Sequence, residues 1–112
     1  MITDRVIESC IEDVYRISGT ELIVTDTIGR VIVKTGDINE PDRDSVCEFA
    51  KSGSELLEIN NQTFIRVADD AETAFVLITN GVGDKIVCAK LTASELKNLV
   101  AAYTDKIDRN SF

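Results

Sequence analysis

Two cationic side chains flank an aromatic one in the C-terminal half of the sequence, and together they could hold a small carboxylate. Arg66 and Lys90 lie on either side of Phe75 if the intervening segments form neighbouring antiparallel strands. A guanidinium group can bind a carboxylate through two parallel hydrogen bonds, and apolar walls strengthen such contacts by excluding water. The alternative is that both cationic heads reach solvent while their stems cover apolar surface.

The expected strand register decides which residues could join this site. If Ala68 pairs with Thr73, and Asn80 with Lys85, side-chain alternation gives the sheet one mixed face and one aliphatic face. The predicted ligand-binding residues, all on the mixed face, are Phe64, Arg66, Phe75, Leu77, Cys88 and Lys90. The aliphatic face carries Ile65, Val67, Val76, Ile78, Val87 and Ala89, and we expect it to pack against the first and last helices.

Other familiar chemistry is absent from the sequence. There is no histidine, which removes Ser-His and Cys-His pairs and histidine metal ligands. The three cysteines are widely spaced and form no C-x-x-C motif, so we interpret them as small reduced hydrophobic residues. Asp37, Asn39 and Glu48 match three positions of a calcium loop, but Pro41 and Asp42 occupy positions that need an oxygen ligand and a glycine. We therefore expect no metal site, no cofactor and no enzymatic activity, with carboxylate chemistry the one enzymatic class left open.

Length and charge limit the function further. The 112 residues suffice for a single domain, 1–112, and the net charge of −8 opposes direct contact with nucleic acid. No apolar run approaches the ~18 residues of a membrane span, and the N-terminus has no signal-peptide pattern. We expect a cytoplasmic domain that binds neither membranes nor DNA by itself.

Apolar periodicity and turn residues predict the elements that would position these residues. Helices are expected over residues 3–17 and 41–52, with a third beginning at the Thr92-Ala93-Ser94-Glu95 capping box. Residues 21–36 predict a hairpin, because Asp26 can bond its own turn backbone and Gly29 can adopt a positive φ. Further strands are expected over 56–59, 62–68, 73–80 and 85–91.

Two segments resemble a known family. The stretch I-S-G-T-E-L-I-V-T-D-T-I-G-R-V-I (17–32) and the ending L-K-N-L-V-A-A-Y-T-D-K-I-D-R-N-S-F (96–112) resemble the N-terminal sensory domain of bacterial sugar-diacid-utilisation regulators, the CdaR/PucR type. The resemblance implies a PAS/GAF-like (profilin-like) α+β fold, an antiparallel five-stranded sheet with flanking N- and C-terminal helices. It also implies that the domain senses a small metabolite, a sugar acid for example, and regulates a helix-turn-helix C-terminal to this chain.

A second family shares the order of elements. Roadblock-type domains run α-ββ-α-βββ-α with a D-x-x-G hairpin, and they are dimeric interaction platforms without a metabolite ligand. The additional short strand at 56–59 and the ending of the chain favour the sensor.

Both families predict a homodimer. A regulator that reads a two-fold symmetric operator pairs through its own two-fold axis. We expect the first and last helices, or the free sheet edge, to form the contact, with Tyr103 and Ile107 extending the last helix past the sheet.

Overall fold

Five antiparallel strands form one sheet, and helices lie on both of its faces. The computed structural model describes residues 4–69, 72–80 and 83–110, and the side chains of 4–67, 75–80 and 83–102. In chain order the elements are α1 (Asp4–Ser18), β1 (Leu22–Thr25), β2 (Val31–Lys34), α2 (Arg43–Ser52), β3 (Leu56–Ile59), β4 (Gln62–Asp69), β5 (Glu72–Thr79) and α3 (Asp84–Asn110). The predicted α+β class, with a five-stranded antiparallel sheet and flanking terminal helices, is confirmed.

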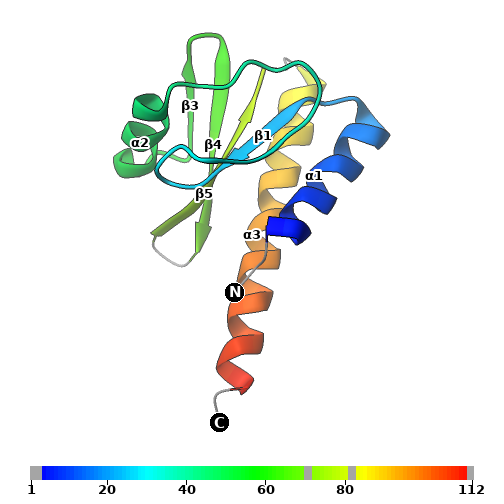
Figure 1. The fold of residues 1–112 in the computed structure, drawn as a ribbon, viewed down its shortest axis with the longest axis vertical. Helices are drawn as coiled ribbons and strands as arrows, with labels where there is room; N and C mark the ends of the chain where they lie inside the picture. Colours follow the sequence, from blue (N-terminus) through cyan, green and yellow to red (C-terminus); the bar gives the residue numbers. More distant parts are fainter. Residues whose placement is uncertain (1–3, 70–71, 81–82, 111–112) are drawn as a thin grey trace.

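The sheet separates two helical layers. Its strands lie in the order β2-β1-β5-β4-β3, so β2 and β3 are the edges and β5 is central. Helices α1 and α3 lie together on one face and α2 lies on the other, while the C-terminal part of α3 projects beyond the sheet (Figure 1). Among the helices of the described residues, none is both long and apolar enough to cross a membrane.

The β1–β2 hairpin forms as its turn residues predict. The Oδ1 atom of Asp26 accepts hydrogen bonds from the backbone N–H groups of Ile28 (3.1 Å) and Arg30 (2.8 Å). Gly29 has a φ of +89°, and a Cβ atom there would lie 2.9 Å from the Cα atom of Arg43. Glycine is therefore required twice at this position, by the backbone conformation and by the close approach of the chain that begins α2.

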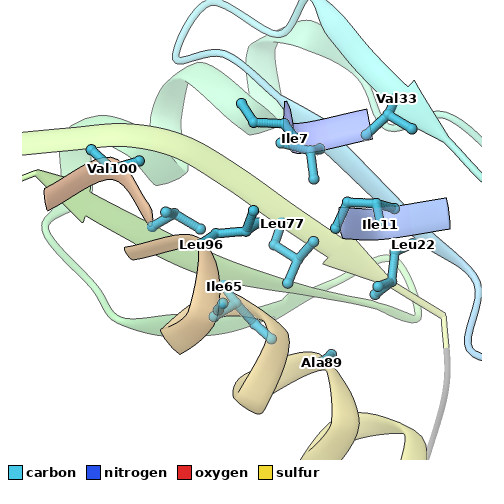
Figure 2. Packing of buried hydrophobic residues seen from close by; sticks show 12 residues of the cluster. Ile7, Ile11, Leu22, Val33, Ile65, Leu77, Ala89, Leu96 and Val100 are labelled. Carbon is cyan, nitrogen blue, oxygen red and sulfur yellow. The ribbon is translucent and has the colours of Figure 1, made fainter. Parts of the chain in front are cut away.

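Each face of the sheet has its own hydrophobic core. The α1/α3 core joins the apolar stripes of α1 and α3 to one face of the sheet (Figure 2). Its buried residues are Ile7, Ile11, Leu22, Val24, Val33, Ile65, Val67, Leu77, Ala89, Ala93, Leu96 and Val100. The α2 core consists of Ile23, Ile38, Val46, Phe49, Phe64, Val76 and Ile78. Because both faces are covered, the central strands are apolar on both sides.

The segment predicted as a strand over 85–91 is helical. It forms the first turns of α3, so the Thr92-Ala93-Ser94-Glu95 motif lies inside a helix, where the Thr92 hydroxyl donates to the Cys88 carbonyl oxygen at 2.8 Å. Buried residues continue at helical spacing from Ala89 through Ala93 and Leu96 to Val100. A run of seven mostly apolar residues does not distinguish a strand from a helix, but the longer stripe at helical spacing does.

A register shift in the β4–β5 hairpin corrects the predicted faces. Ala68 does pair with Thr73, as expected, but the register shifts by one between Val67 and Ala68, so that Val67 pairs with Phe75. One inserted residue moves every later side chain of a strand to the opposite face. The expectation that Val76 and Ile78 face α1 and α3 is therefore wrong, since they belong to the α2 core, with Leu77 in the α1/α3 core instead.

Candidate functional site

The structure does not bring the six predicted ligand-binding residues together. Phe64 is buried in the α2 core, where its ring packs edge-on against Phe49 with centroids 5.7 Å apart. Leu77 is buried in the α1/α3 core on the opposite face, and Phe75 packs against that same core. The register shift separates these aromatic and aliphatic residues, so the mixed face on which the predicted pocket depended does not exist.

The two predicted cationic residues are also far apart in the fold. Arg66 lies on β4, on the same face as Phe64, and its Nη1 atom is 3.5 Å from Glu55 Oε1. Its backbone N–H also donates to the Glu55 carbonyl oxygen at 2.9 Å. Arg66 thus ties the segment before β3 to β4. Lys90 is exposed on α3, across the sheet, because its expected strand is helical.

Cys88 is on α3 as well, beside the end of α1. Its Sγ atom lies 3.6 Å from the hydroxyl oxygen of Ser18. Because Cys88 and Lys90 sit on a helix that covers the sheet, neither can complete a pocket with Phe64 and Arg66. The side chains of Tyr103 and Ile107, expected to extend the dimer surface, lie outside the described residues.

The edge strand β3 exposes two adjacent leucines. Leu56 pairs with Ile65 and Leu57 with Phe64, so the two side chains point to opposite faces of the sheet. Leu56 is 40% exposed and Leu57 is 43% exposed, although both are large apolar residues. Sequence reasoning identified the strand but not its position at the edge, which depends on the order of the strands. The signal that could have been used is the pair of consecutive leucines in a strand of only four residues.

A second apolar feature is a hollow between α1 and α3 on the outer side of the helical layer. Its lining includes Val6, Cys10 and Leu99, with charged side chains at its rim, and its volume is about 540 Å³. Burial raises the pKa of the Cys10 thiol, and the carboxylates of Glu95 and Asp13 raise it further. The thiol is therefore held in its neutral form and is a poor nucleophile. The hollow is therefore suited to binding through its shape and charge, and not to chemistry at the thiol.

A second hollow, of about 390 Å³, is polar. It is lined by Asn39, Glu40, Pro41, Asp42, Asn60, Asn61, Gln62 and Asn80. The Nε2 atom of Gln62 donates to the Asn39 carbonyl oxygen at 2.6 Å, which links the β3–β4 turn to the loop before α2. Within the described part of the chain, no three acidic, cysteine or histidine residues are grouped as a metal site would require. The side-chain amide of Gln62 therefore joins the start of β4 to the loop before α2.

Comparisons with known proteins identify the fold and no more. No family model matches the chain, and no curated protein matches it. Among solved structures, the chain is similar to MglB in a tetrameric arrangement, with a TM-score of 0.54 and 13% sequence identity over 92% of this chain and 90% of that one. At this identity the likeness concerns the arrangement of helices and strands: the chain has an α+β fold of the same type as that protein.

Proposed function

We propose that this chain is a dimeric protein-interaction platform that neither catalyses a reaction nor binds a metabolite. The observation that carries the proposal is the edge strand β3, with Leu56 and Leu57 exposed on a sheet whose two faces are otherwise filled. An edge strand presents unpaired backbone groups, and soluble proteins usually protect such edges. Exposed leucines at an edge indicate that another chain covers it.

The order of elements supports the platform over the sensor. Once residues 85–91 belong to α3, three strands remain between α2 and α3, and the order becomes α-ββ-α-βββ-α. This is the order of roadblock-type domains. The additional strand that favoured a sensory domain is no longer additional, because β3 is now the first of those three strands.

A second copy of the chain is the partner that we assign to β3. Antiparallel pairing of two identical edge strands follows a two-fold axis, so one surface patch covers itself and the association closes at two copies. Burial of the leucines contributes about 25 cal/mol per Å² of apolar surface removed from water. The tetrameric arrangement of MglB supports self-association of this fold.

The proposal is tested by measuring self-association of an edge variant. Leu57→Lys places a charge on the edge, as natural edge strands do. We expect the wild type to dimerise at micromolar concentration in sedimentation equilibrium, and Leu57→Lys to raise the dimer Kd at least about tenfold, or ~1.4 kcal/mol. Val87→Lys on α3, at a residue that is 54% exposed and away from β3, is the matched control and should dimerise normally.

Two results would contradict the proposal. One is a wild-type chain that stays monomeric at about 100 μM, which corresponds to a dimerisation free energy weaker than ~5.5 kcal/mol. The other is equal dimerisation of wild type and Leu57→Lys, which would place the contact elsewhere.

The resemblance to CdaR/PucR-type sensory domains stays a prediction with its own test. A thermal-shift screen against sugar acids and related carboxylates measures whether any of them binds the folded chain, since a ligand of the native state raises the melting temperature. A compound that raises the melting temperature in a saturable manner would favour the sensor and contradict a platform without a metabolite.

A further inference from the structure

One face of α3 is turned away from both the sheet and α1, which lies beside α3 on the same side of the sheet (Figure 1). The residues that bury the inner face of α3 recur at helical spacing and are Ala89, Ala93, Leu96 and Val100. The flank toward α1 carries Cys88, which contacts Ser18. The remaining outer face is exposed at every position from residue 87 to residue 101 that points away from these two contacts.

The outer face carries an uncharged stripe with the spacing of a coiled coil. Its positions are separated alternately by four and three residues, and they are Val87, Leu91, Ser94, Asn98 and Ala101. Val87 is 54% exposed and Leu91 is 67% exposed, although both are apolar. This alternation keeps one seam of a helix facing a partner helix. The next two positions in the sequence are Asp105 and Asp108, so the uncharged stripe covers 87–101, about 21 Å of helix.

Charges of opposite sign border the stripe on its two sides. Lys90 and Lys97 lie on one side, each directly before a position of the stripe, and Glu95 lies on the other side, directly after one. All three side chains are exposed, and no residue three or four positions away along α3 has the opposite charge. Within the described part of the chain, none of the three takes part in an ion pair. These charges are therefore available to a partner.

A second copy of this chain complements the charges beside the stripe if the two α3 helices run parallel. In a heptad abcdefg, Leu91 and Asn98 occupy a positions, Lys90 and Lys97 occupy g, and Glu95 occupies e. Parallel pairing brings each g residue to the e residue of the next heptad on the other helix, so Lys90 faces Glu95 of the second copy and Glu95 faces its Lys90. Antiparallel pairing would place Lys90 opposite Lys97 of the second copy, and like charges would oppose it. Asn98 favours the same arrangement, because an asparagine at one a position specifies register and oligomeric state.

We propose that the outer face of α3 is a second self-association surface, on which the α3 helices of two copies pair in parallel along residues 87–101. This goes beyond the dimer at β3, because the face points away from the sheet whose edge is β3, so the two contacts form independently. Val87 and Leu91 are the only large apolar residues of the stripe, and the contact is therefore weaker than the β3 dimer. At micromolar concentration the β3 dimer forms without it, and at higher concentration the α3 contact joins dimers into larger assemblies.

The first experiment isolates the α3 contact by removing the β3 contact. In the Leu57→Lys chain, sedimentation at increasing concentration should show a dimer with a Kd of about 0.1–1 mM, and the wild type should exceed the mass of a dimer over the same range. Leu91→Lys, combined with Leu57→Lys, should leave only monomer, because the charge falls in the centre of the seam. A Leu57→Lys chain that stays monomeric at about 1 mM, or that dimerises equally well with Leu91→Lys, would overturn the proposal.

A charge swap tests the parallel register in the same Leu57→Lys background. Lys90→Glu and Glu95→Lys should each raise the Kd of the α3 contact about threefold to tenfold, because each creates two like-charge pairs. The double variant Lys90→Glu/Glu95→Lys restores both pairs with reversed sign and should return the Kd to within about twofold of its starting value. The single changes shift the net charge in opposite directions, so net charge cannot produce this pattern. A double variant no stronger than the single ones would contradict the register.

Asn98 provides a test in the direction of tighter association. Asn98→Leu replaces the polar a position by an apolar one and should lower the Kd of the α3 contact at least about tenfold, since the asparagine specifies register at a cost in stability. Ser9 is exposed on α1, away from the stripe, and Ser9→Leu is the matched control for added apolar surface. An Asn98→Leu variant that associates no more tightly than Ser9→Leu would mean that residue 98 is not in a contact.

Disulfide trapping locates the contact directly. In a parallel seam each residue of the stripe meets its own counterpart, so Ser94→Cys places two thiols face to face. With copper phenanthroline as the oxidant, we expect Ser94→Cys to form a linked dimer at least about tenfold faster than Ser9→Cys, as seen by non-reducing electrophoresis. The wild type, whose three cysteines are half-buried, gives the background. If Ser94→Cys is linked no faster than Ser9→Cys, the α3 helices do not pair in this way and the proposal is wrong.

Discussion

The two edges of the sheet are strands of equal length in different environments. β2 has its first two residues half-buried and Val33 buried, with α1 packed on it. β3 has three exposed residues followed by one half-buried residue, and its main packing among the described elements is on β4. Local sequence does not explain this difference, because both strands are rich in aliphatic residues. An apolar edge that a helix covers is part of the core, whereas an apolar edge left open is an interaction surface.

The central strand β5 lies between the two edges, and we expect it not to tolerate a charged side chain. Val76 lies on β5 and is fully buried in the α2 core, so Val76→Asp would bury a carboxylate without a counter-charge. Domains have about 5–15 kcal/mol of stability in total, and we expect this variant not to fold, as measured by circular dichroism. Val87→Asp, at an exposed valine, should stay folded. A folded Val76→Asp would show that the α2 core is not closed.

Side-chain truncation should mainly lower monomer stability at the β2 edge and mainly weaken dimerisation at the β3 edge. Val33→Ala on β2 removes methyl groups from the core and should lower the free energy of unfolding by about 1–3 kcal/mol, without altering dimerisation. Leu57→Ala on β3 should lower it by less than about 1 kcal/mol in the monomer, yet weaken the dimer. Urea unfolding at a concentration below dimer formation, paired with sedimentation, measures both effects. Equal losses of monomer stability would mean that β3 is a core strand and the comparison fails.

Arginine–carboxylate pairs near the two edges provide the smallest contrast. Asp26 accepts two backbone N–H groups in the β1–β2 turn and pairs with Arg30, with Nε to Oδ2 at 3.2 Å. Asp26→Ala should therefore cost about 1–2 kcal/mol through the turn. The side chain of Arg66 is only 15% exposed but that of Glu55 is 82% exposed, so water screens the carboxylate and Glu55→Ala should cost no more than about 0.5 kcal/mol. Thermal melts measure both variants, and we expect the lower melting temperature for Asp26→Ala. A lower melting temperature for Glu55→Ala would show that the Arg66 pair is the stronger one.

Much of the fold was predictable from local sequence. The stripe of α1, the Asp26 and Gly29 turn, and the strands expected over 56–59 and 62–68 all appear where their patterns indicated. Gly53 ends α2 with a φ of +74°, as a glycine after a helix does. In each case the cause is contained in a few consecutive residues, because backbone conformation and apolar spacing are local properties.

The candidate site was not predictable in the same way. Whether Phe75 shares a face with Phe64 depends on one shifted position in the β4–β5 ladder. Whether Lys90 belongs to the sheet depends on the packing of its neighbours Ala89 and Ala93, as residues of α3, in the α1/α3 core. Both are decided by contacts between segments distant in the sequence. The sequence by itself determined most of the elements, though not the helical state of residues 85–91, together with the acidic charge and the absence of histidine. Only the tertiary structure decided that β3 lies at an open edge, because burial depends on which segments meet.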